Sequence, residues 1–235
     1  MSTMTTSKSR SGKNLLLSTF IAISFVLGTL LGAVLASIWI EGAPLLQLSP
    51  EEAYTRSITI VGIDKTTGEG RLAVLKVELR NGSGHLSISV PPYENEDTQR
   101  AAVNAKKAAE ILTNKDLSQV DITITVENIS PETLITGPSS SAAMAVLMVA
   151  AIRASENSGP NAVRQDVVVS ASVSSTGVLE PVGEIIKKYQ TVREAGEYSL
   201  FVIAATQLEH LHDYPGISVE RARNLDQLAK LVLEQ

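Results

Sequence analysis

Residues 140–154 constrain the fold of this chain more than any other segment. They read SSAAMAVLMVAAIRA and carry one charge, that of Arg153, near the end. A helix that is apolar on all sides has to be buried, and a membrane span needs about 20 residues. At 15 residues the segment is too short to cross a bilayer. It therefore predicts a central core helix, with the rest of a globular domain packed around it.

Apolar periodicity predicts the elements around this helix. Residues 120–126 alternate, with Val120, Ile122 and Ile124 on one side, which is typical of a half-buried strand. Further strands are expected at 72–79, 85–90, 166–173 and 200–205, and further helices at 99–112, 184–195 and 224–233. Because strands and helices mix without a regular βαβ alternation, we expect one α+β (mixed α/β) domain over residues 54–235.

A turn signal separates two of the expected strands. Asn81-Gly82-Ser83-Gly84 lies between residues 72–79 and residues 85–90. Asn-Gly between two strand patterns is a strong signal for a tight turn. The sequence therefore predicts a β-hairpin at this point.

The N-terminal part of the chain carries a membrane signal. Residues 15–40 are 26 residues without a charge, with Trp39 near one end and three cations before the other. A helix of this length, at ~1.5 Å per residue, crosses a ~30 Å hydrocarbon core. By the positive-inside rule, residues 1–14 are then a cytoplasmic tail and the domain is extracytoplasmic. Residues 41–53 are expected to be a linker.

A cleaved signal peptide is the alternative for this segment. Val34-Leu35-Ala36 offers small residues of the kind found at cleavage sites. The apolar run is longer than the ~7–15 residues of a typical signal h-region, which favours an uncleaved, single-pass anchor.

Charge and residue types exclude several classes of function. The net charge of −5 divides into +3 for residues 1–14 and −8 for residues 15–235, and an acidic domain without a basic stripe argues against nucleic-acid binding. The absence of cysteine excludes disulfides, thiolate metal sites and a cysteine nucleophile. His210 and His212 have no third ligand nearby, and there is no Walker A pattern, so no metal, cofactor or ATPase is expected.

Three serines precede the core helix, in the sequence Gly137-Pro138-Ser139-Ser140-Ser141. Serine is a preferred N-cap, so these hydroxyls can be explained as caps of the helix. The start of a helix also supplies free N–H groups and a positive dipole end, which suit a nucleophile and its anionic intermediate. Such a serine needs a base, and without a suitable histidine the candidate is a lysine.

Lys188 is the lysine whose position on a helix suggests burial. At ~100° per residue, Ile185, Tyr189 and Val192 form an apolar stripe that includes Lys188, whereas Lys187 projects to the other side. Burial favours the neutral amine, which can act as a base. The alternatives are that Lys188 reaches the surface with its amine or pairs with Glu184.

Two motifs in this order resemble the proteolytic domain of the Lon protease family. In that family a Gly-Pro-Ser or similar motif carries the nucleophile, and a lysine five residues after the first glycine of a downstream Pro-Ile-Gly-Gly segment carries the base. Gly137-Pro138-Ser139 and Pro181-Val182-Gly183, with Lys188 at that spacing, match this pattern, and the looser similarity extends over residues 70–205. The resemblance implies a Lon-type fold for residues 54–235.

The resemblance also implies a function and roles for single residues. It implies a serine endopeptidase with a Ser139–Lys188 dyad, supported by Gly137, Ser140 and Ser141 around the oxyanion and by Ser170, where the family has a threonine near the lysine. Because the chain has no ATPase segment and its domain is expected outside the cytoplasm, cleavage of unfolded or extended polypeptides is expected to be ATP-independent. A homo-oligomeric ring, often a hexamer, is a further expectation from the family.

A catalytically silent relative is the alternative to an enzyme. Thr136 replaces an acidic residue that the family often has before its serine motif, and Glu184 replaces the second glycine of Gly-Gly. With these departures, the chain could act as a membrane-bound binding or assembly module.

Overall fold

The computed structural model describes residues 43–89, 96–128, 137–211 and 215–234. The compact unit that carries the fold spans Pro44–Gln235. It begins earlier than Tyr54, because Leu46 and Leu48, in the range expected to be a linker, are buried in it. The Leu46 N–H donates to the carbonyl of Asp116 at 3.0 Å, which fixes this entry segment to the domain.

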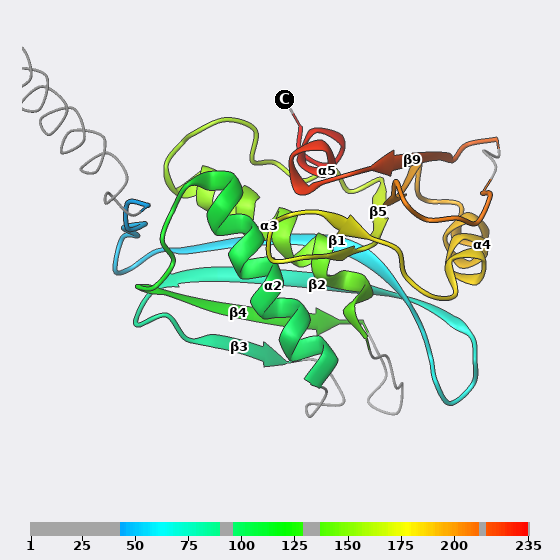
Figure 1. Cartoon of the computed structure of the whole chain (residues 1–235), viewed down its shortest axis with the longest axis horizontal. Helices are drawn as coiled ribbons and strands as arrows, with labels where there is room; N and C mark the ends of the chain where they lie inside the picture. Colours follow the sequence, from blue (N-terminus) through cyan, green and yellow to red (C-terminus); the bar gives the residue numbers. More distant parts are fainter. Residues whose placement is uncertain (1–42, 90–95, 129–136, 212–214, 235) are drawn as a thin grey trace, which may run out of the picture. The chain divides into compact units, whose positions relative to one another are not determined.

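A seven-stranded mixed sheet, in the order β3-β4-β2-β1-β5-β8-β9, forms the centre of this unit (Figure 1). Its strands are β1 (Ala53–Ile63), β2 (Gly70–Asn81), β3 (Leu86–Ser89), β4 (Val120–Glu127), β5 (Val167–Ser170), β8 (Leu200–Ala204) and β9 (Ser218–Ala222). β2 is antiparallel to β1 and β4, and the other neighbouring strands are parallel. A separate ribbon pairs β6 (Ser172–Val173) with β7 (Leu179–Glu180). The mixed α/β class expected from the sequence is confirmed.

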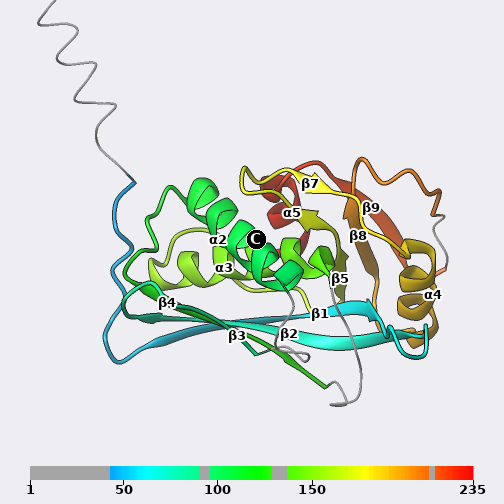
Figure 2. The same cartoon turned by 60° about the horizontal axis from the view of Figure 1, so that its bottom comes forward.

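Helices cover both faces of the sheet (Figure 2). The helices on one face are α2 (Glu96–Thr113), α3 (Ser141–Ser155) and α5 (Leu225–Val232), and the helix on the other is α4 (Ile185–Ala195). The strands separate the two faces by their alternation. Val167 and Val169 of β5 pack with α3, whereas Val168 between them packs with α4.

The two faces are packed to different extents. We call the larger group of buried residues, built on α2, α3 and α5, the α3 core, and the smaller group the α4 core. The α4 core consists of Val61, Val168, Val182, Ile185, Tyr189, Val192, Phe201, Ile203 and Ile217. Every residue of α3 from Ser141 to Ile152 is buried, so the central core helix expected from its composition is confirmed.

The prediction of a β-hairpin at residues 81–84 is wrong. β2 and β3 are not neighbours, because β4 lies between them, antiparallel to β2 and parallel to β3. The turn crosses the start of β4 instead. The Gly82 N–H donates to the carbonyl of Gln119, and the Asp121 carboxylate accepts from the N–H groups of Ser83 and His85.

The segment expected as one strand at 166–173 is two strands in different sheets. β5 ends at Ser170, and β6 begins at Ser172 and pairs only with β7 among the described residues. We attribute the break between β5 and β6 to the carbonyl of Ala171, which accepts a hydrogen bond from the N–H of Ala142 at the start of α3. β1, β7 and β9 were not expected from the sequence.

The predicted anchor at residues 15–40 and the tail at residues 1–14 lie outside the described residues. Within the described part of the chain, Pro138–Ser155 is long and apolar enough to count as a membrane span by those measures alone. Its side chains are buried inside the domain from Ser141 to Ile152, as expected for a core helix.

Candidate active site

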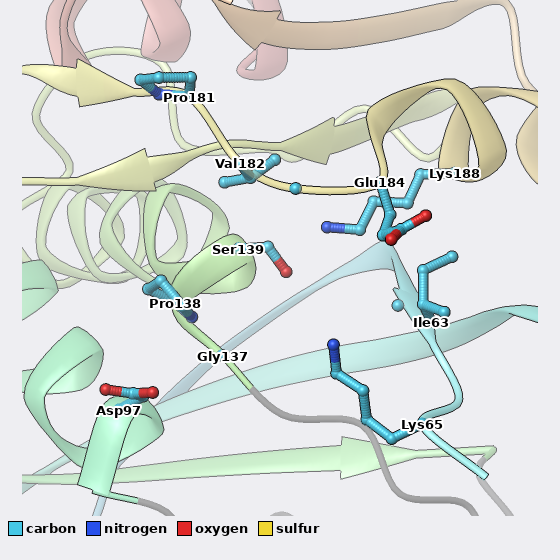
Figure 3. A pocket seen from close by; sticks show the side chains of 12 residues that line it. Ile63, Lys65, Asp97, Gly137, Pro138, Ser139, Pro181, Val182, Glu184 and Lys188 are labelled. Atoms are coloured by element: carbon cyan, nitrogen blue, oxygen red, sulfur yellow. The ribbon is translucent and has the colours of Figure 1, made fainter. Parts of the chain in front are cut away.

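A pocket of about 330 Å³ opens where the end of β1, the start of α3 and the start of α4 come together (Figure 3). Ser139 and Lys188, the two residues singled out from the sequence, both line it. Ser139 belongs to the helix layer on one face of the sheet and Lys188 to the helix on the other. The rest of its wall comes from Gly62, Ile63, Lys65, Asp97, Gly137, Pro138 and residues 181–184.

A short turn positions Ser139 at the mouth of the core helix. Gly137 has a φ of 111°, in the region that favours glycine, although a Cβ there would meet nothing within 4 Å. Pro138 then begins a 3₁₀ turn, Pro138–Ser140, that leads directly into α3. Proline suits the first helical position, because its φ is already helical and its missing N–H has no partner to lose.

Ser141 fixes the start of α3 to the segment that follows β5. It is fully buried, and its hydroxyl oxygen accepts from the N–H of Val173 at 2.9 Å and lies 3.4 Å from the Ser172 hydroxyl. Its own N–H donates to the carbonyl of Pro138. Ser141 is therefore a structural residue that does not line the pocket, which corrects the expectation that it lines an oxyanion site.

The capping explanation for the remaining serines does not fit the structure. Ser140 occupies the N-cap position of α3 but forms no side-chain capping hydrogen bond. Ser139 is half-buried, and its hydroxyl points into the pocket (Figure 3). The Ser139 hydroxyl is thus available to a bound molecule, and helix capping does not account for it.

Lys188 is held in the interior by the apolar stripe of α4. The side chain is 5% exposed and lies on the same face as Ile185, Tyr189 and Val192. Burial, and to a smaller extent the nearby charge of Lys65, lower the pKa of Lys188 from 10.5 to about 8, although Glu184 partly opposes them. A substantial fraction of neutral amine is therefore present near pH 8.

The alternatives for Lys188 are wrong. Its amine does not reach the surface, and no hydrogen bond or ion pair joins the Lys188 side chain to Glu184 or to any other described residue. Lys187, next to it in the chain, is exposed and donates from Nζ to the carbonyl of Gly68 at 2.9 Å. Lys188 is thus buried and Lys187 exposed, as the helical periodicity predicts.

Ser170 does not have the role expected of it. Its hydroxyl is fully buried and has no hydrogen-bond partner within the described part of the chain, so it does not orient the Lys188 amine. It lies at the end of β5 and does not line the pocket. A buried hydroxyl without a partner is unusual in a folded protein, but it carries no role that the structure identifies.

The sequence reasoning missed Lys65 as a pocket residue and did not foresee the conformation of Glu184. Figure 3 shows the Lys65 amine pointing into the same space as Ser139 and Lys188. Glu184 precedes α4 with φ 59° and ψ 27°, a left-handed conformation that side chains rarely adopt. Lon proteolytic domains, which the sequence resembles, have the second glycine of Gly-Gly at this position, and glycine adopts such a backbone readily.

The described residues include no group of three or more His, Asp or Glu side chains that could hold a metal ion. His210 is exposed, and His212 lies outside the described residues. The pocket therefore combines the Ser139 hydroxyl, the buried amine of Lys188 and the exposed amine of Lys65 with the carboxylates of Asp97 and Glu184. A scan of the sequence against models of protein families found no match, and a search of the curated proteins also found none.

Proposed function

We propose that the chain is a serine endopeptidase in which Ser139 is the nucleophile and Lys188 the general base. The observation that carries this proposal is that a lysine with 5% exposure and a lowered pKa shares a pocket with a serine hydroxyl that caps nothing. A lysine amine accepts a proton only when it is neutral, and burial raises the fraction of neutral amine near pH 8.

The reaction proceeds in two steps. Neutral Lys188 takes the proton of the Ser139 hydroxyl while Oγ forms a bond to the peptide carbonyl carbon. As the carbon–nitrogen bond breaks, the leaving amine takes that proton from Lys188, and an ester with Ser139 remains. Lys188 then takes a proton from a water, which attacks the ester. As the bond from the carbonyl carbon to Oγ breaks, Lys188 gives that proton to Oγ, which restores the Ser139 hydroxyl and releases the carboxyl product.

Backbone N–H groups stabilise the negative oxygen formed in both steps. The N–H groups of Ser139, which lines the pocket, and of Ser140, which follows it and does not line the pocket, belong to the turn at the start of α3. The Ser141 N–H is already bonded to Pro138. Donors fixed by a folded helix start stabilise developing charge without having to reorient during the reaction.

We also propose a location, a substrate class and a mode of assembly for this peptidase. The uncharged run at residues 15–40 supports a single-pass anchor with the domain outside the cytoplasm. Cleavage of unfolded or extended polypeptides without ATP, and assembly into a ring, follow from the resemblance to Lon proteolytic domains. A catalytically silent binding module remains the competing function.

The test uses the full chain in nonionic detergent with casein as substrate. We expect Ser139→Ala and Lys188→Met to lose activity by about 10³-fold or more, the scale on which serine and base substitutions act. The exposed Ser118 and Lys107 lie outside the pocket, so Ser118→Ala and Lys107→Met serve as matched controls that keep full activity. Equal activity in all five proteins, each shown to be folded by circular dichroism, would refute the peptidase and favour the binding module.

A further inference from the structure

Lys65 extends from the turn between β1 and β2 into the pocket that holds Ser139 and Lys188. It lines the pocket together with Ile63 at the end of β1, and its amine faces the same space as the Ser139 hydroxyl (Figure 3). The sequence places it in a polar stretch, Asp64-Lys65-Thr66-Thr67-Gly68, that resembles an ordinary solvated turn. Only the fold brings this cation beside the proposed catalytic pair.

The turn that carries Lys65 is held by its own hydrogen bonds. The buried Asp64 accepts from the Thr66 N–H at 2.9 Å and from the Thr67 hydroxyl at 3.0 Å, and its carbonyl accepts from the Gly68 N–H at 2.7 Å. These bonds fix the backbone on both sides of Lys65.

The same turn is fixed against α4, the helix that carries Lys188. Lys187 donates to the carbonyl of Gly68 at 2.9 Å. A Cβ on Gly70 would lie 1.8 Å from the Thr191 hydroxyl, so the chain here touches α4 directly. Lys65 and Lys188 therefore extend from two backbone segments that are joined to each other.

The charges around the pocket leave the amine of Lys65 available. The pocket acid Asp97 is paired with Arg100 on α2, and Glu184 acts on Lys188, whose pKa it raises. Lys65 has no ion pair with any residue that the structure describes. Its positive charge also contributes to the lowered pKa of Lys188, which agrees with their sharing one space.

We propose that Lys65 is a specificity-determining residue that binds a carboxylate of the substrate next to the scissile bond. The inference rests on the proposed peptidase function and names its substrate class: polypeptides with an acidic residue, or a free C-terminal carboxylate, close to the cleavage point. An ammonium on a pocket wall recognises either source by a charge-assisted hydrogen bond. The rigid turn lowers the entropy lost when that bond forms.

The experiment compares fluorogenic peptides that differ in one group, with glutamate or glutamine placed at each position flanking the scissile bond. A second pair carries a free or an amidated C-terminus, which separates the two sources of carboxylate. For an exposed ion pair we expect a preference for the acid of about fivefold in kcat/KM, expressed mainly in KM and weakened by salt. Lys65→Met should abolish the preference, and Lys65→Glu should reverse it, so that the glutamine peptide is preferred.

Lys107→Met removes a charge of the same sign outside the pocket and should keep the preference of the original chain. An unchanged acid preference in Lys65→Met would overturn the proposal. An equal loss of kcat on the acid and amide peptides would also overturn it, because it would show a general electrostatic or structural role.

Binding of the same peptides to Ser139→Ala, followed by fluorescence anisotropy, reads the preference without turnover. A Ser139→Ala protein that binds the acid peptide about fivefold more tightly supports the role of Lys65, even if the original chain cleaves nothing. Equal affinity for acid and amide peptides would overturn that role even if the chain is an active peptidase. The failure of one proposal is therefore distinguishable from the failure of the other.

Discussion

The two faces of the sheet bury different kinds of residue. The α3 core packs three helices against the sheet, and from Ala142 to Ile152 the residues of α3 buried in it are all apolar. The α4 core packs one helix against the sheet. Lys188 lies on that helix beside the residues of the α4 core, and it is buried although it carries an amine. One face therefore provides a rigid mount for Ser139, and the other provides an apolar environment for the amine of Lys188.

The difference shows how a fold can bury a titratable group at a tolerable cost. A charge inside the α3 core would be surrounded by apolar atoms, which costs several kcal/mol. Lys188 lies at the edge of a small core, where the pocket begins, so its side chain is buried and still lines the pocket. Substitutions in the two cores should therefore have different consequences for stability and activity.

The largest effects are expected from a matched pair of core substitutions. Ile152 of α3 and Ile185 of α4 are 0% and 1% exposed, respectively. Either isoleucine-to-alanine change should destabilise the domain by about 2–5 kcal/mol, with Ile152→Ala the more costly because its surroundings are more enclosed. Urea unfolding followed by circular dichroism measures both.

Activity should separate this pair further. Under conditions where both variants are folded, Ile185→Ala should lose activity because its cavity loosens the helix that positions Lys188, whereas Ile152→Ala should keep it. Equal retention of activity in both would show that the α4 core does not control the site.

The next effect concerns the pH dependence of stability. The shift of the Lys188 pKa from 10.5 to about 8 corresponds to about 3 kcal/mol. Between these values the unfolded chain holds more protons than the folded one, so the contribution of Lys188 to stability rises with pH, and below pH 8 its buried charge is destabilising. Lys188→Met should therefore be the more stable protein at pH 7, by an amount that shrinks as the pH approaches 10.5.

The measurement is the difference in free energy of unfolding between the original chain and Lys188→Met, because other titrating groups cancel in it. Any change in packing adds a constant offset. A difference that is independent of pH between 7 and 10.5 would contradict the burial of Lys188.

The smallest effect is expected at the neighbouring lysine. Lys187→Ala removes an exposed hydrogen bond to Gly68, which should cost no more than about 1 kcal/mol. Thermal unfolding compares it with Lys188→Met at pH 7, where the two changes should have opposite signs. A stabilisation by Lys187→Ala equal to that of Lys188→Met would remove the distinction between the two faces of α4.

Local patterns in the sequence predicted those parts of the fold that depend on one segment alone. The composition of residues 140–154 was sufficient to identify α3, and the periodicity of residues 184–195 placed Lys188 inside and Lys187 outside. β1 was missed because its burial changes along its length, from half-buried at Tyr54 to buried on both faces near Val61. Such a strand shows no single period.

Contacts between distant segments could not be predicted in the same way. The Asn81-Gly82 signal was read as a hairpin because nothing local shows that β4 inserts between β2 and β3. Lys65 was missed for a similar reason, since its turn meets α4 only in the fold. The roles expected for Ser141 and Ser170 came from the resemblance, and they failed because the geometry of these side chains is set by β5, β6 and the start of α3.

The pairing of Ser139 with Lys188 is tested by the rate at which a fluorophosphonate modifies Ser139 as a function of pH, measured by mass spectrometry on the full chain. We expect modification of Ser139 at a rate that rises through a midpoint of about pH 8, the pKa of Lys188. Ser139 in Lys188→Met should react slowly and without that rise. An unmodified Ser139, or an identical pH profile in Lys188→Met, would contradict this pairing.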